Sequence, residues 1–292
     1  ARAEGKNWVF RGGNCLPPEN RYCLVSLSDG GKDAVTVREY DVQAKRWIEG
    51  GFSFPEGKQS VTWIDRNTLY VGREWAPGEL TTSGYAYVVK RVTRGQPLER
   101  AREVFRGERT DVSASVGTLR DADGVVRATL AYRGRTFWEN EIALVTSRGT
   151  VPLAFPRRMD LHGLVEGRLL FTTNEDWNGF KSGDLLSYEL QSLLNKPAEA
   201  RAELVLRPGP RESVEGVTLT RTRVVVALYE NVRGAAYAYT RGANGWTRTR
   251  LQLPENLTVS LGSASRRSDQ LFVNVQGYLT PQTLMLADAA TG

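Results

Sequence analysis

The chain has 292 residues, of which 40% are hydrophobic, and a formal net charge of +6 at pH 7. This size and hydrophobic content allow a full buried core. No apolar run approaches the roughly 20 residues of a membrane-spanning helix, and residues 1–6 contain no apolar signal-peptide core. Arginine and lysine are scattered, which indicates a solvated basic surface and gives no sign of a nucleic-acid site. We therefore expect a soluble chain with neither a nucleic-acid nor a membrane partner.

Short runs rich in β-branched and aromatic residues recur along the chain, separated by polar turns that contain Gly or Pro. The clearest set lies between Gly50 and Phe105, where runs at 60–64, 68–71, 85–89 and 103–105 indicate four antiparallel strands. The same plan recurs in units at 7–48, 50–105, 112–153, 161–206, 216–249 and 258–287. The last unit is one strand short.

The spacing of these units predicts the fold. Their first strands begin near residues 60, 112, 161, 215 and 259, which is a repeat of roughly 45 to 55 residues, as in β-propeller blades. The only plausible helix, at 190–195, ends before Lys196-Pro197. No long polar linker divides the chain. We predict an all-β fold, a β-propeller of four-stranded antiparallel blades, in a single domain over residues 1–292.

The two cysteines, Cys15 and Cys23, bracket a predicted hairpin turn and could face each other across two strands. Two cysteines are too few for a zinc site, and their spacing matches no Cys-x-x-Cys pattern. A disulfide would indicate an oxidising compartment, whereas two free thiols would suit a cytoplasm. Between these alternatives we favour free thiols, and a cytoplasmic over a periplasmic location.

The chain has one histidine, His162, at the start of a predicted strand. A Ser-His-Asp hydrolase needs a histidine to take the serine proton, but no Gly-x-Ser-x-Gly elbow occurs in the sequence. The sequence also contains no phosphate-binding Gly-rich loop with a lysine and no His-x-x-x-His pair. We therefore assign no catalytic residue, no cofactor and no cofactor-binding residue, and no metal ligand.

Acidic residues raise the alternative of a propeller glycosidase, which would place carboxylates around a central channel. Six of them lie near strand ends or turns: Asp65, Asp111, Asp160, Glu175, Asp176 and Glu215. Acids at strand ends usually form turns, because an Asp side chain accepts hydrogen bonds from neighbouring backbone amides. The glycosidase is therefore the least favoured alternative.

Several short motifs, in order and spacing, resemble the propeller of bacterial proteins in the prolyl oligopeptidase family. They are LVSLSDGGKDA at 24–34, GGF at 50–52, WID at 63–65, TLYV at 68–71, LTTSGY at 80–85 and FVNVQGYLTPQTL at 272–284. The last motif resembles the segment that closes that propeller before the chain re-enters the peptidase domain. The resemblance extends over essentially the whole chain.

The resemblance implies a function and two partners. Members of this family are serine peptidases in which a seven-bladed propeller covers the active site of an α/β-hydrolase domain and admits only short peptides. The implied partners are therefore that hydrolase domain, on the same polypeptide, and an oligopeptide substrate. This chain lacks the hydrolase domain and every triad residue, so it carries no catalysis of its own, and its six units indicate a truncated propeller. A stand-alone propeller that scaffolds protein partners is the main alternative.

Overall fold

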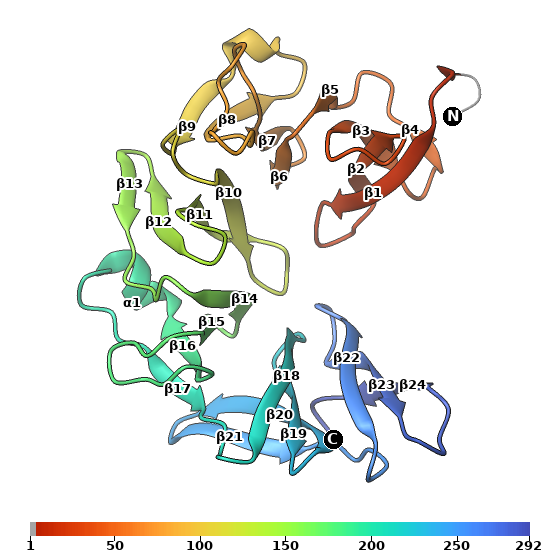
Figure 1. The fold of residues 1–292 in the computed structure, drawn as a ribbon, viewed down its shortest axis with the longest axis vertical. Helices are drawn as coiled ribbons and strands as arrows, with labels where there is room; N and C mark the ends of the chain where they lie inside the picture. Colours follow the sequence, from red (N-terminus) through yellow and green to blue (C-terminus); the bar gives the residue numbers. More distant parts are fainter. Residues whose placement is uncertain (1–3) are drawn as a thin grey trace. The chain divides into compact units, whose positions relative to one another are not determined.

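The computed structural model describes residues 4–292 and shows a chain built almost entirely of antiparallel β-sheets (Figure 1). The chain forms two compact units, one with residues up to Leu119 and Val126–Phe155, the other with Arg120–Val125 and Pro156–Gly292. Over the described residues the strands form six sheets, three belonging mainly to each unit. These sheets are the six expected units, and their strands pair in chain order as propeller blades do.

The first unit contains three sheets. The first consists of β1 (Trp8–Cys15), β2 (Tyr22–Asp29), β3 (Val35–Asp41) and β4 (Arg46–Trp47), with β5 (Ser53–Gly57) also paired to β3. The second consists of β6 (Ser60–Asp65), β7 (Thr68–Gly72), β8 (Val88–Thr93) and β9 (Arg102–Arg106), with a 3-10 turn at Leu98–Arg100. The third consists of β10 (Ser113–Arg120), β11 (Val126–Gly134), β12 (Asn140–Thr146) and β13 (Gly149–Pro152).

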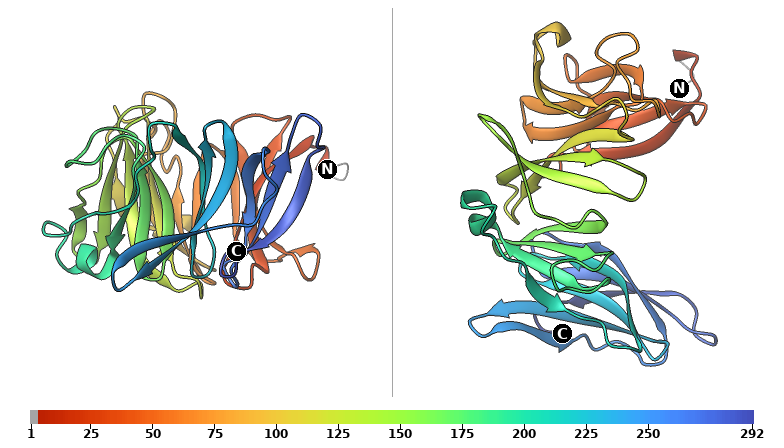
Figure 2. Two further views of the ribbon diagram at one scale, coloured as in Figure 1. Left: turned by 90° about the horizontal axis from the view of Figure 1, so that it is seen from below. Right: turned by 60° about the vertical axis from the view of Figure 1, so that its left-hand side comes forward.

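The second unit contains the other three sheets, which pack face to face in chain order (Figure 2). The fourth sheet consists of β14 (Met159–Val165), β15 (Arg168–Thr173), β16 (Leu185–Glu189) and β17 (Glu203–Leu206), with helix α1 (Leu190–Asn195) before β17. The fifth consists of β18 (Glu212–Leu219), β19 (Val224–Glu230), β20 (Arg233–Gly242) and β21 (Gly245–Arg250). The sixth has three strands, β22 (Thr258–Ala264), β23 (Gln270–Gln276) and β24 (Thr283–Asp288).

The core lies between successive sheets, and strand β19 shows why. Its alternate residues Val224, Val226 and Leu228 pack against the fourth sheet, whereas Val225 and Ala227 pack against the sixth. Successive side chains of a strand point to opposite faces, so a strand covered on both faces must be apolar throughout. The VVVAL run is therefore the sequence of a central strand between two neighbouring blades.

The predicted strands and helix are largely confirmed, with two differences in the first unit. Helix α1 spans the predicted residues, and the Glu189 side chain caps it by accepting the backbone N–H of Ser192 at 2.7 Å. Strand β8 begins at Val88 and not at Tyr85, because the Tyr85 carbonyl accepts the Thr81 N–H in a turn. Strand β5, which sequence patterns did not indicate, pairs with β3.

The prediction of free thiols is wrong. Cys15 and Cys23 are direct partners in the β1–β2 pairing, and their sulfurs form a disulfide. Antiparallel pairing brings facing residues close enough for their side chains to bond, so the pairing register decided the outcome. The argument from free thiols to a cytoplasmic location no longer holds.

No helix in residues 4–292 is both long and apolar enough to cross a membrane.

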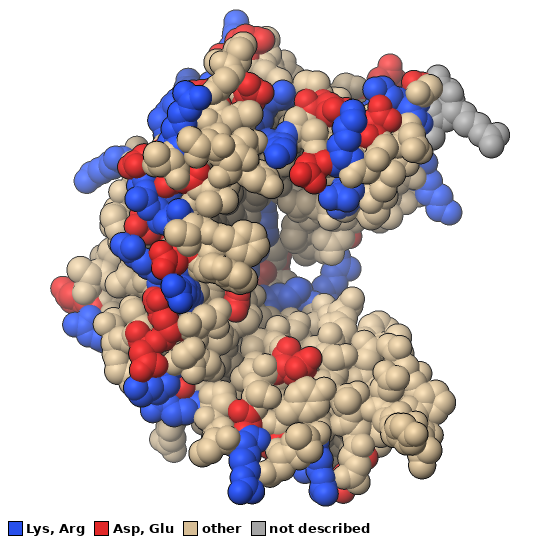
Figure 3. Space-filling view, in the orientation of Figure 1, with Lys and Arg blue, Asp and Glu red and all other residues tan. Residues whose placement is uncertain are grey.

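The sixth sheet leaves an apolar surface uncovered. Phe272, Leu284 and Leu286 are 42%, 59% and 61% exposed, and they lie together because Phe272 pairs directly with Leu286. The sequence from 270 to 287 contains no charged residue, and the surface over β22–β24 is correspondingly free of blue and red in Figure 3. Strand β24 also has no partner on its outer edge among the described residues.

Candidate functional site

A cavity of about 650 Å³ lies in the second unit, between the fourth sheet and strand β18. Its walls come from the start of β14, the end of β15, the β15–β16 connection, residues 207–209 and the start of β18. The volume is within the range of small-ligand pockets. Polar side chains dominate the lining, among them Asp160, His162, Asn174, Asp184, Glu212 and Glu215.

Two β-bulges place side chains at this cavity. The pairing of β14 with β15 shifts register at His162, and the pairing of β18 with β19 shifts register at Glu215. A bulge residue leaves the hydrogen-bonded ladder, and its side chain is re-aimed. His162 and Glu215 both line the cavity, so the same irregularity in two successive first strands brings an imidazole and a carboxylate to one site.

His162 is partly buried, and its Nε2 lies 2.8 Å from the Thr172 hydroxyl. Burial lowers the pKa of His162 below its ordinary 6.5, and the nearby Asp160 carboxylate opposes this shift. Asp160 itself accepts a hydrogen bond from the Asn174 side chain at 2.9 Å. The imidazole is therefore neutral near pH 7 and bonded to a threonine, which is not the arrangement of a serine hydrolase triad.

The opposite wall is held by an ion pair between the buried Asp184 and the half-exposed Arg207. The Asp184 side chain is 1% exposed and binds the Arg207 guanidinium, with Nη2 at 2.5 Å and Nε at 3.0 Å. Asp184 also accepts the Lys181 backbone N–H at 2.8 Å. The Lys181 ammonium lies 2.7 Å from Asp176. Both cations that line the cavity are thus already paired with carboxylates.

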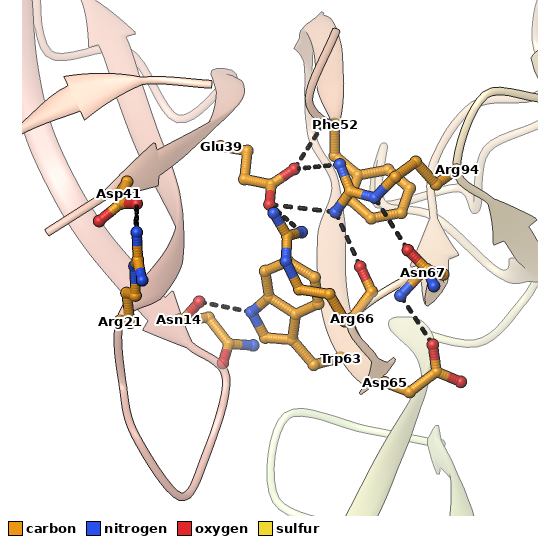
Figure 4. Close-up of polar contacts among 10 residues, drawn as sticks. All are labelled: Asn14, Arg21, Glu39, Asp41, Phe52, Trp63, Asp65, Arg66, Asn67 and Arg94. Carbon is orange, nitrogen blue, oxygen red and sulfur yellow. Dashed lines mark hydrogen bonds and ion pairs between the residues drawn. The ribbon is translucent and has the colours of Figure 1, made fainter. Parts of the chain in front are cut away.

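A second ionic cluster joins the first two sheets of the first unit (Figure 4). The Glu39 side chain is fully buried and accepts the Phe52 backbone N–H at 2.8 Å. The two Arg94 Nη atoms bind the two Glu39 oxygens at 2.8 and 3.0 Å, and Arg66 binds the same carboxylate. The Arg94 guanidinium also lies over the Phe52 ring, 4.3 Å from its centroid. The Glu39 cluster therefore ties strand β3 to the turns of the next sheet.

The other acids considered for a glycosidase have structural partners. Asp65 accepts the Asn67 N–H and the Thr68 hydroxyl in a turn. Glu175 accepts the Arg157 N–H at 2.7 Å. Asp111 is buried and binds Arg133 and Arg135 at 2.6 and 2.8 Å. Of the six acids, the structure brings only Asp160 and Glu215 to the lining of the cavity.

Sequence reasoning missed Asp184, Arg207 and the Glu39 cluster. A signal for Glu39 existed, because it follows Val35 and Val37 at alternate positions of a strand and so faces the same buried side. No comparable signal existed for Asp184. Asp184 lies in a connection between strands, and the residue that it binds, Arg207, is 23 residues away along the chain.

Comparison with known proteins decides the family. The model of the prolyl oligopeptidase N-terminal beta-propeller domain matches residues 1–292. The chain belongs to this family. An uncharacterized peptidase of Sinorhizobium fredii is 45% identical over 301 residues, with 100% of this chain and 42% of that protein covered. An uncharacterized peptidase of Rickettsia prowazekii is 23% identical over 303 residues, with 97% of this chain and 42% of that protein covered.

The fold has a close counterpart among solved structures. A post-proline cleaving enzyme from Rickettsia typhi superposes with a TM-score of 0.86 at 22% identity, over 98% of this chain and 44% of that chain. The predicted β-propeller fold and the resemblance to this family's propellers are therefore confirmed. The chain spans less than half the length of the peptidases that it matches.

Proposed function

We propose that this chain is the propeller that covers the active site of a prolyl-oligopeptidase-type serine peptidase and restricts access to short peptides. The observation that carries the proposal is the family match over residues 1–292 together with the 42% of each related peptidase that the chain spans. The remaining length of such a peptidase is sufficient for a catalytic domain.

The residues of the chain support a non-catalytic role. Its one histidine is bonded to Thr172 and lies beside Asp160, and the sequence has no nucleophile elbow. A cover over a catalytic chamber needs no reactive residue, because it acts by excluding large substrates and water. The partners of this propeller are then a hydrolase domain on the same polypeptide and an oligopeptide substrate.

The test compares the full-length peptidase with this chain alone. Two substrates are used, a short proline-containing peptide and a folded protein that carries the same sequence in a surface loop. We expect the full-length protein to cleave only the short peptide, with inhibition by a serine-directed fluorophosphonate, and the isolated chain to cleave neither. Equal cleavage of both substrates by the full-length protein, or hydrolysis by the isolated chain, would contradict the proposal.

A further inference from the structure

We propose that the tip of the β11–β12 hairpin, with the exposed rings of Phe137 and Trp138, anchors this chain to the catalytic domain of the same polypeptide. The identification of the partner as a catalytic domain rests on the proposed function. The docking surface itself rests on the structure of the first unit and on a pattern of exposure that recurs in the second.

The most exposed apolar side chains are confined to one kind of connection. Among the large hydrophobic residues at positions 4–292, the five most exposed are Phe137, Trp138, Val232, Tyr278 and Leu279. Each lies between the second and third strands of its sheet. The strands pair antiparallel in chain order, so this connection leaves a sheet at the end where its first strand begins. Recurrence in three sheets indicates an interaction surface rather than the chance exposure of one loop.

The aromatic pair of the third sheet is held in a fixed arrangement. Phe137 and Trp138 are 78% and 72% exposed, and their rings meet edge to face with centroids 4.8 Å apart. The Thr136 hydroxyl accepts the backbone N–H groups of Trp138 and Glu139 at 3.2 and 3.1 Å. The Arg135 N–H closes the turn by donating to the Glu139 carbonyl at 2.8 Å. Preorganised aromatic side chains lose little freedom on binding and are typical anchors of protein interfaces.

The hairpin is tied to the neighbouring sheet at the same end. In the β7–β8 connection, the Thr81 hydroxyl donates to the Val112 carbonyl at 3.1 Å. The Val112 N–H in turn donates to the carbonyl of Gly134, the last residue of β11, at 2.8 Å. The β7–β8 connection and the β11–β12 hairpin therefore belong to one connected end of the second and third sheets.

This end also carries an arginine without a counterion. Arg73 directly follows β7 and is partly buried, yet no carboxylate of residues 4–292 lies within ion-pair distance of its guanidinium. Its Nη1 is buried without a hydrogen-bond partner, and its Nε donates to the Glu74 carbonyl at 3.3 Å. Because buried charges in proteins are usually paired, the partner surface should supply a carboxylate to Arg73 beside an apolar socket for the aromatic pair.

The extent of the related peptidases favours a domain as the occupant. This chain covers only 42% of each of the two related peptidases, so more than half of each lies outside the match. Contacts between domains of one chain typically bury roughly 600–1,500 Å². A short peptide offers too little surface to cover apolar side chains on connections of three sheets. A substrate peptide and a second copy of the chain are the alternative occupants, and the test distinguishes both.

Hydroxyl-radical footprinting read by mass spectrometry tests the contact without relying on activity. The full-length peptidase and the 292-residue chain alone are oxidised under identical conditions. The internal control is Trp47, which is 44% exposed and lies on the fourth strand of the first sheet, away from the connections between second and third strands. We expect Phe137 and Trp138 to be oxidised at least about threefold more slowly in the full-length protein, relative to Trp47, because the core of an interface excludes water.

Three other footprints would overturn the proposal. Equal oxidation of the pair in both proteins would mean that no domain covers it. Protection in the chain alone that grows with protein concentration would assign the surface to a second copy. Protection of the full-length protein only after a short proline-containing peptide is added to the fluorophosphonate-treated enzyme would assign the pair to substrate binding.

Variants separate docking from folding. Phe137→Ser combined with Trp138→Ser should leave the thermal midpoint of the chain alone unchanged, because both side chains are exposed. In the full-length protein the same change should lower the midpoint by at least about 2 °C. The matched control, Val151→Ser, replaces an exposed residue on β13 of the same sheet and should affect both proteins equally. Equal effects of the double variant on both proteins would contradict docking.

Arg73→Met gives a second test, in which the sign of the effect differs between the two proteins. In the chain alone it removes a partly buried cation that has no counterion, so the thermal midpoint should stay the same or rise. In the full-length protein it removes one partner of an ion pair, so the midpoint should fall. A fall of the same size in both proteins would show that Arg73 serves the fold of this chain and not a partner.

The outcomes for docking and for the proposed function are distinguishable. A full-length protein that protects Phe137 and Trp138 yet cleaves no peptide would refute the proposed function alone. Peptide cleavage by a full-length protein with an unprotected pair would refute the docking surface alone.

Discussion

Replacing Glu39 by Gln removes the charge at the centre of the Glu39 cluster while keeping the shape of the side chain. Glu39 is fully buried, whereas the side chains of its partners Arg66 and Arg94 are 33% and 22% exposed. Removing one partner of a buried ion pair typically costs 3–5 kcal/mol, because the remaining charges stay desolvated without a counterion. Both arginines reach solvent in part, so we expect a smaller loss of about 2–4 kcal/mol in the free energy of unfolding.

The assay is urea unfolding followed by tryptophan fluorescence. Trp63 is 1% exposed and packs edge-on against Phe52, whose N–H Glu39 accepts, so unfolding around the cluster changes the environment of this tryptophan. The control is Glu199→Gln, whose ion pair with Lys196 is largely exposed and should contribute little. A Glu39→Gln variant no less stable than the control, at an unchanged denaturant slope, would refute the assignment of Glu39 as a structural anchor.

Three further perturbations have defined outcomes. Burial holds the pKa of His162 below 6.5, so as the pH falls the unfolded chain protonates this histidine before the folded chain does. Urea unfolding at a series of pH values should show the full contribution of His162 to the free energy of unfolding above pH 6.5, and a decline as the pH falls toward the folded pKa. His162→Gln should flatten that decline. Cys15→Ser removes the Cys15–Cys23 disulfide, which joins residues 8 apart in the sequence, and should lower the free energy of unfolding by about 2–3 kcal/mol. A reducing agent should destabilise the parent chain but not this variant, and equal destabilisation of both would contradict the prediction. The uncovered apolar face and free edge of the sixth sheet should promote self-association of the isolated chain, so sedimentation should show oligomers that Leu286→Lys disperses, and a monomer at high concentration would exclude this.

Strands and turns were accessible to sequence reasoning because their signals are local. Runs of β-branched residues, Gly and Pro turns and the alternation of Val35, Val37 and Glu39 all act within a few residues. They indicated six repeating units and the helix at 190–195, and the structure contains both. Sequence patterns did not indicate strand β5, because the Pro55 within it argues against a strand. In the structure Pro55 lies where the register of the β3–β5 pairing shifts.

The repeated β-architecture and the family could be inferred from the residues alone, since both depend on short motifs and on their spacing. Which side chains meet became known only from the folded chain. Glu39 binds arginines 27 and 55 residues away, Cys15 bonds to Cys23 through the register of two strands, and His162 and Glu215 share a cavity through bulges in two different sheets. Such contacts depend on register and on the packing of one sheet against the next. The residues of a single strand can show which face is buried, but they do not specify which residue of another strand or turn will lie opposite.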